Sequence, residues 1–183
     1  FSIFVVTKVA GATIVTVGLI MGLYWLVKSV LQIPVANYLD KHDGEKDDFY
    51  ALLISLFLAA VAAFMLSKTS TLWQLFLAQF LYAIAMGFYV PSWAGIFSRH
   101  LDSKRFSFDW SFDSTVVGLT SFVSAILAGV LAQKFGFSVV FFIVGVLSLA
   151  SVILLFMVPD LIIPRVKTKE PIIEDHSVKG IGR

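Results

Sequence analysis

The sequence predicts an all-α membrane protein, a polytopic bundle of helices. Of its 183 residues, 58% are apolar and only 14% are charged, whereas soluble domains carry roughly 25% charged residues. The mean hydropathy is +0.91. Four stretches without Lys, Arg, Asp or Glu, at 49–67, 69–98, 114–133 and 135–159, are long enough to span a bilayer as helices, which takes roughly 18–20 residues.

The elements follow from these stretches in chain order. Residues 1–9 are apolar but too short to cross, and we expect them to be the last turns of a first spanning helix that starts outside this sequence. The connections between the remaining stretches are short, polar or contain glycine. Five complete spanning helices are therefore expected, approximately at 13–39, 49–67, 71–98, 110–134 and 137–159. The helical bundle takes residues 1–163, and residues 164–183 form a polar cytoplasmic tail or linker.

The charges of the connections predict the orientation. Ten basic residues fall on the side that holds the tail, whereas the opposite side has only Lys8, Lys68 and Lys134. The positive-inside rule places the first side in the cytoplasm. We therefore expect a multi-pass protein of the plasma membrane, the inner membrane in a cell that has two, with a cytoplasmic C-terminal tail.

One charged residue, Lys28, falls at bilayer depth. It lies twelve positions before Asp40, roughly 18 Å along a helix, and therefore near the middle of the hydrocarbon core. Tyr24 and Gln32 share its helix face, and a second stripe at helical spacing follows on the third complete helix. The candidates for a substrate pathway are Tyr24, Lys28, Gln32, Gln79, Tyr82, Met86, Tyr89 and Trp93. The alternatives are snorkelling or a structural hydrogen bond for the lysine, and packing for the aromatic residues.

The connection at residues 36–48 carries a recognisable pattern, with Asp40, Lys41, Gly44 and Lys46 at its informative positions. It resembles the cytoplasmic loop signature of the major facilitator superfamily (MFS), although it has one extra residue before the glycine. The segments 91–100, 113–118 and 133–137 are similar to the fourth to sixth helices of such transporters. In this signature Asp40 would form breakable ion pairs with Lys41 or Arg99.

The resemblance implies an MFS-type half, with five complete helices and the end of a first. It implies transport of a small solute by alternating access. Because the family's substrate site lies between two six-helix halves, a second half is required, in the same chain, as a second copy or as a separate protein. The alternative is a non-transporting membrane assembly or regulatory module that retains the fold. Gln79 stands where many proton-coupled members carry arginine, which weakens any expectation of proton antiport.

The sequence offers no sign of enzyme chemistry. His42, His100 and His176 are far apart, and no metal-ligand spacing, phosphate loop or hydrolase elbow is present. A net charge of +2 and the absence of cysteine give no basic nucleic-acid footprint and no thiol chemistry. We therefore expect no catalytic residues, no metal, no cofactor and no nucleic-acid partner, but a lipid bilayer and a small-molecule solute.

Overall fold

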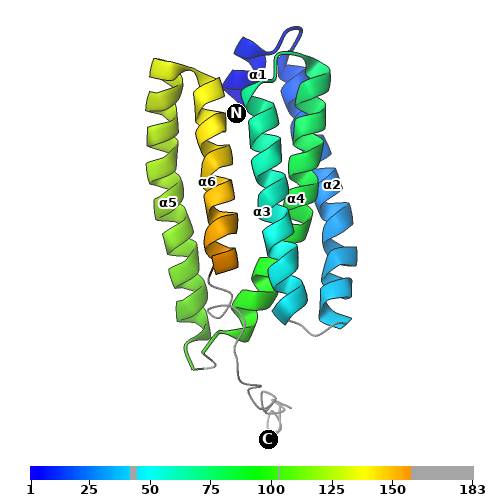
Figure 1. The fold of residues 1–183 in the computed structure, drawn as a ribbon, viewed down its shortest axis with the longest axis vertical. Helices are drawn as coiled ribbons and strands as arrows, with labels where there is room; N and C mark the ends of the chain where they lie inside the picture. The colour runs from blue at the N-terminus through cyan, green and yellow to red at the C-terminus, as the bar shows by residue number, and fades with distance from the viewer. Residues whose placement is uncertain (42–44, 103, 158–183) are drawn as a thin grey trace, which may run out of the picture.

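The computed structural model describes residues 1–41, 45–102 and 104–157, and every regular element in these ranges is a helix. Five of these helices are long and apolar enough to cross a membrane, so the predicted all-α polytopic bundle is confirmed. The expected tail at 164–183 lies outside the described residues. In chain order the helices are α1 (Ser2–Lys8), α2 (Ile14–Lys41), α3 (Glu45–Ser67), α4 (Leu72–Arg99), α5 (Phe106–Phe135) and α6 (Phe137–Met157) (Figure 1).

Tight connections at one end of the bundle return the chain on itself. Thr71 and Gln74 form a capping box at the start of α4, in which each side chain accepts a hydrogen bond from the other's backbone N–H. Gly11 and Gly136 have φ of 76° and 84°, a backbone conformation that favours glycine, between α1 and α2 and between α5 and α6. At the opposite end α2 ends, α3 begins and α4 ends (Figure 1). We call this the motif end.

Helix α3 is the centre of the packing, because it contacts both α4 and α6, while α2 packs against α4. Its buried positions include four small ones, Ala59, Ala60, Ala62 and Ala63. Small side chains let helix backbones approach closely, which is the main way that helices associate in lipid. On α4, Gly87 serves the same purpose, since a Cβ added there would lie 3.0 Å from the Cβ of Leu31 on α2.

The short helix α1 is anchored at the end of the bundle opposite the motif end. Phe4 is 2% exposed, and its ring centroid lies 4.8 Å from that of Phe141 and 5.6 Å from that of Phe137, both on α6. Phe4 also belongs to a buried cluster with Ile20 of α2 and Leu75 of α4. Helix α1 therefore ties α2, α4 and α6 together at this end.

Helix α5 is the least enclosed element. None of its described residues is buried, and its packing partner is α6, beside which it stands at the edge of the bundle (Figure 1). A Cβ added at Gly129 of α5 would meet nothing within 4 Å, and the same holds for Gly18 and Gly22 of α2. The faces of α2 and α5 that carry these glycines are thus open within this chain.

Candidate functional site

The candidate pathway residues on α2 and α4 meet near the middle of the spans. The ring of Tyr24 stacks on that of Tyr82, with centroids 5.8 Å apart and planes inclined by 21°. The Lys28 Nζ lies 4.7 Å from the ring centroid of Trp25 and 5.9 Å from that of Tyr24. A cation over an aromatic face gains about 0.5–2 kcal/mol, more when water is excluded. The lysine predicted at depth is thus held at an aromatic platform on its own helix.

The other pathway candidates occupy different surroundings. Gln79 is 6% exposed and lies inside the bundle, whereas Gln32 and Met86 are half-buried. Tyr89 and Trp93 line a cavity of about 390 Å³ together with residues of α3 and α6, among them Ser151. The structure therefore brings Tyr24, Lys28 and Tyr82 together and places Tyr89 and Trp93 in a second group nearer the motif end.

Aromatic contacts join this second group to α5. The ring of Trp93 stacks on that of Phe97 with centroids 5.7 Å apart, and Phe97 meets Trp110 of α5 edge-on at 4.9 Å. Trp110 lies in the second turn of α5, whose first turn carries Asp109. The Asp109 carboxylate accepts a hydrogen bond from the backbone N–H of Asp102, 3.1 Å away, and so fixes the connection between α4 and α5.

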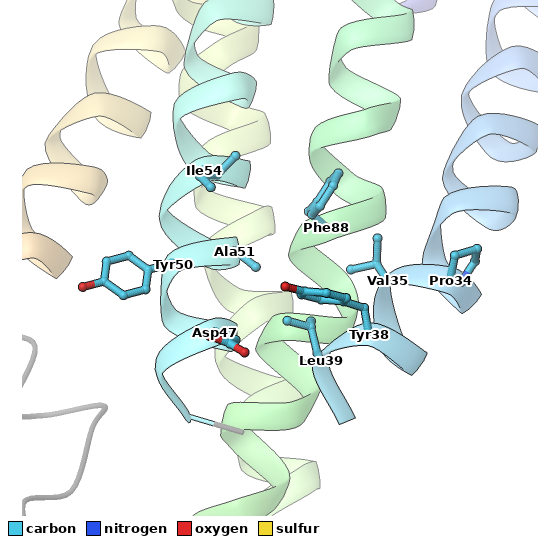
Figure 2. A pocket seen from close by; sticks show the side chains of 9 residues that line it. All are labelled: Pro34, Val35, Tyr38, Leu39, Asp47, Tyr50, Ala51, Ile54 and Phe88. Carbon is cyan, nitrogen blue, oxygen red and sulfur yellow. The ribbon is translucent and has the colours of Figure 1, made fainter. Parts of the chain in front are cut away.

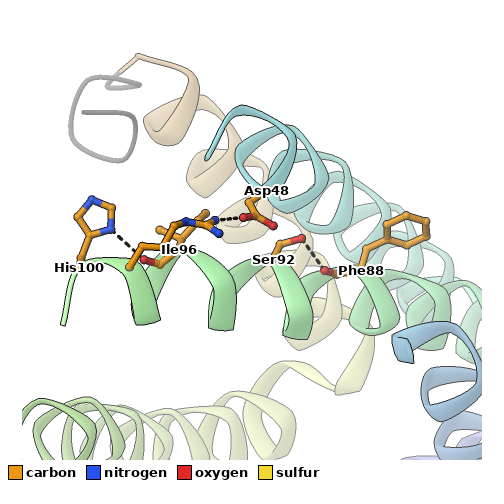
Figure 3. Close-up of polar contacts among 6 residues, drawn as sticks. Asp48, Phe88, Ser92, Ile96 and His100 are labelled. Atoms are coloured by element: carbon orange, nitrogen blue, oxygen red, sulfur yellow. Dashed lines mark hydrogen bonds and ion pairs between the residues drawn. The ribbon is translucent and has the colours of Figure 1, made fainter. Parts of the chain in front are cut away.

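The motif end contains a partly buried ion pair between α3 and α4 (Figure 3). Arg99, the last residue of α4, donates to the carboxylate of Asp48 in the first turn of α3, and the Asp48 side chain is only 3% exposed. A Cβ added at Gly95 would lie 3.0 Å from Asp48 Oδ2 and 3.3 Å from Arg99 Nη2. The missing side chain at Gly95 therefore makes the room in which the two charges meet.

Helix α4 satisfies its other polar groups near this pair by local bonds. The hydroxyl of Ser92 donates to the carbonyl of Phe88 at 2.8 Å, and the Nδ1 of His100 lies 2.8 Å from the carbonyl of Ile96 (Figure 3). These bonds use carbonyls of the same helix one turn earlier. Between α4 and α3, the ion pair of Arg99 with Asp48 is a long-range polar contact at this end.

The loop-motif residues are placed differently from expectation at one point. Asp40, Lys41 and Lys46 are exposed at the motif end, and Gly44 lies outside the described residues. Asp40 was expected to pair with Lys41 or Arg99, and the ion pair that Arg99 forms among the described residues is with Asp48 of α3. The reason is geometric, because Asp48 lies on the face of α3 that packs against α4, whereas Asp40 lies in the last turn of α2 with its side chain exposed.

The comparisons decide the family. The family described as Major Facilitator Superfamily matches residues 1–179. The chain belongs to the major facilitator superfamily. No curated protein and no solved structure matches it. This major facilitator protein is accordingly a multi-pass membrane protein of a transporter family, which the five long apolar helices among the described residues also support.

Sequence reasoning missed Asp48, although the major facilitator chain carries a signal for it. The buried residues Asp48, Leu52, Ser55, Ala59, Ala62 and Leu66 of α3 recur every three or four positions. This spacing is that of one helix face. Extending the apolar stripe backwards from Leu52 by one turn reaches Asp48, which indicates a buried carboxylate in need of a cation.

Within the described ranges, no group of three or more His, Asp or Glu side chains is placed to hold a metal ion.

Proposed function

We propose that this chain is one half of a solute transporter that works by alternating access with a second half. The observation that carries the proposal is that Tyr24, near the middle of its span, contacts both Lys28 and Tyr82. Ionisable groups inside a membrane are energetically costly, and those that are present usually face a water-filled cavity or a polar partner and mark a solute or ion pathway. An ammonium and two phenols supply the donors that an anionic or hydroxylated solute needs when it leaves water.

The open faces of the chain support a partner half. In this family a substrate site lies near the midplane between two halves, so one half cannot enclose it. Helix α5 has no buried residue, and the glycines at positions 18 and 22 of α2 have open space before them. Small residues on open helix faces suit helix association in lipid. The partner is the other part of a longer chain, a second copy or a separate protein.

The charge pattern supports an orientation with the motif end in the cytoplasm. Lys41, Lys46, Arg99, Lys104 and Arg105 lie at this end, whereas the connections at the other end carry Lys8, Lys68 and Lys134. The positive-inside rule favours cytoplasmic placement of the more basic side. We place the protein in the plasma membrane on this basis, with its C-terminal tail in the cytoplasm.

A second candidate function is a non-transporting assembly or regulatory module. The contact that favours it is the cation–π contact between Lys28 and Trp25, which satisfies the charge within one helix and without a solute. The two candidates differ in what Lys28 does. In a transporter Lys28 contacts the solute, whereas in an assembly it only stabilises the packing of the helices.

Uptake by membrane vesicles separates the candidates. Vesicles from cells that express the protein retain any partner half, and they are assayed with labelled sugars, amino acids, carboxylates and phosphate esters against vesicles without the protein. Lys28→Met keeps the side-chain length and removes the charge. Lys68→Met, in the exposed connection before α4, is the matched control.

We expect uptake of at least one solute, loss of that uptake in Lys28→Met, and normal uptake in Lys68→Met. Thermal stability in detergent is measured on the same variants. A Lys28→Met protein that transports at the parental rate contradicts the pathway role of Lys28. Loss of stability with unchanged solute affinity favours the assembly function.

A further inference from the structure

Two cavities open between helices near the motif end. The first, of about 410 Å³, lies between α2 and α3, and Tyr38 reaches across it toward α3 (Figure 2). The second, of about 390 Å³, lies between α3, α4 and α6. Both volumes are within the range of small-molecule sites. The second cavity contains Tyr89 and Trp93, the two pathway candidates that lie away from Lys28.

The wall of the second cavity is mostly aliphatic. Five of its eight lining residues are Leu or Ile, contributed by all three helices. Leu52 and Ile96 are 3% and 6% exposed, whereas Leu154 is 64% exposed, so the cavity has a buried inner side and an open outer side. The hydroxyl of Ser151, also in the wall, donates to the carbonyl of Leu147 at 3.0 Å. This wall suits a ligand with an apolar body and few polar groups.

Two aromatic rings form the α4 side of the cavity. Tyr89 and Trp93 are one helical turn apart on α4, which places them on the same face of the helix. The ring of Trp93 stacks on that of Phe97 with planes inclined by 18°, and this contact holds the indole in place. The face of a Trp or Tyr ring attracts a cation within about 6 Å of its centroid. The cavity therefore offers a cation two aromatic partners.

A carboxylate of α5 acts on the same group of residues. The negative charge of Asp113 is near enough to interact with the hydroxyl of Tyr89. Asp113 is half-buried and lies seven residues after Phe106, the first residue of α5, which is roughly 10 Å into the helix. A half-buried carboxylate at this depth is costly unless a polar or cationic partner faces it.

The cations of the neighbouring segments have other contacts. Among the described residues Asp113 has no ion-pair partner, and Arg99 pairs with Asp48. The guanidinium carbon of Arg105 lies 4.8 Å from the ring centroid of Phe108. The Asp113 carboxylate is therefore available to a cation that comes from outside this chain.

We propose that the cavity between α3, α4 and α6 binds an organic ammonium ion that has an apolar body. The apolar body lies among the Leu and Ile side chains, and the ammonium lies against the rings of Tyr89 and Trp93 and donates to the Asp113 carboxylate. An alcohol of the same shape lacks the charge for both contacts, and a carboxylate is repelled by Asp113. This preference is for the opposite charge to that of the Lys28 region, and it does not depend on whether the chain transports a solute.

Isothermal titration calorimetry with three probes tests the charge preference. Phenylpropylammonium, phenylpropanol and phenylpropanoate share one apolar body, and each is titrated at neutral pH into protein purified in a non-ionic detergent from cells that supply any partner half. Titration into detergent alone is subtracted. We expect the ammonium to bind about tenfold more tightly than the alcohol, the order for one charge-assisted hydrogen bond. The propanoate should bind more weakly than the alcohol.

Variants then locate the site. Asp113→Asn keeps the size of the side chain and is expected to abolish the preference for the ammonium, whereas Asp102→Asn, in the exposed α4–α5 connection, is expected to keep it. Ser151→Phe fills the cavity and leaves the carboxylate in place, so it should weaken ammonium binding about tenfold, the order of one lost cation–π contact. The helical signal and the thermal stability show which variants are folded.

Three results would overturn the proposal. The first is equal affinity of the unaltered protein for the ammonium and the alcohol, or no binding of the ammonium, and this comparison does not depend on the folding of any variant. The second is an ammonium preference that survives in a folded Asp113→Asn protein. The third is unchanged ammonium binding by a folded Ser151→Phe protein, which would mean that the ammonium pairs with a surface carboxylate outside the cavity.

Discussion

Replacing Asp48 by Asn should loosen the packing of α3 on α4 at the motif end. The change preserves the shape of the side chain but leaves the Arg99 guanidinium without its carboxylate. Breaking a fully buried ion pair costs about 3–5 kcal/mol, while an exposed pair contributes about 0–1 kcal/mol. The Asp48 side chain is 3% exposed and that of Arg99 is 34% exposed, so the pair lies between these limits. We expect Asp48→Asn to lower the free energy of unfolding by about 1–3 kcal/mol.

A double-mutant cycle measures the pair itself. Asp48→Asn, Arg99→Gln and the double variant are unfolded by titration with a denaturing detergent, with the helical signal as the readout. We expect a coupling energy of about 1–2 kcal/mol, which lies within the range for residues in direct contact. Asp40→Asn is the control, because this exposed carboxylate has no described cation partner, and it should change stability by less than about 0.5 kcal/mol.

Additivity of the two single variants, to within about 0.3–0.5 kcal/mol, would refute the reasoning. The two charges would then not hold the helices together, and the burial of Asp48 would have to be explained by packing alone. An effect of Asp40→Asn as large as that of Asp48→Asn would also refute it, since the signature aspartate would then be the structural one.

Three further predictions concern packing, switching and topology. Gly145→Ala should destabilise the protein by about 1–2 kcal/mol in the same titration, because the new Cβ would lie 2.7 Å from the Phe64 ring. Gly129→Ala should be neutral or slightly stabilising, because a Cβ added at this position meets nothing within 4 Å. Equal effects of the two substitutions on stability would contradict this prediction. The Asp40→Asn protein should insert into the membrane normally but take up solute more slowly in vesicles. Normal uptake kinetics would mean that the loop signature only forms a turn and has no part in switching. A cysteine at position 177 of the cysteine-free chain should resist labelling from outside intact cells, and its labelling would reverse the topology.

The fold was largely predictable from sequence, because bilayer thickness imposes a length on every apolar stretch. The long apolar runs predict spanning helices without any knowledge of packing. How the helices pack was not predictable in the same way. The openness of α5 and the anchoring of Phe4 against Phe141 depend on which faces meet, and around α5 the apolar residues are distributed almost evenly.

The candidate site was predictable only in part. The position of Lys28 at depth follows from counting residues from Asp40, but its aromatic partner Trp25 depends on the rotamer of a long side chain. The burial of Asp48 was not predicted for a different reason, since a run of acidic residues at the start of a helix is typical of exposed helix ends. Only the buried stripe that continues from Leu52 distinguishes Asp48 from the half-buried Asp47 beside it.

The most direct test of the central claim is whether water reaches the polar face of α4 in the membrane. A single cysteine at Met86, half-buried on the stripe, is compared with one at Phe57, which is 52% exposed at a similar depth on α3. Both are treated with a membrane-impermeant maleimide in cells that supply any partner half. A transporter half predicts labelling of the Met86→Cys protein and none of the Phe57→Cys protein. Failure to label at position 86, with labelling of a denatured sample as the control, would mean a dry interface and would contradict transport along this face.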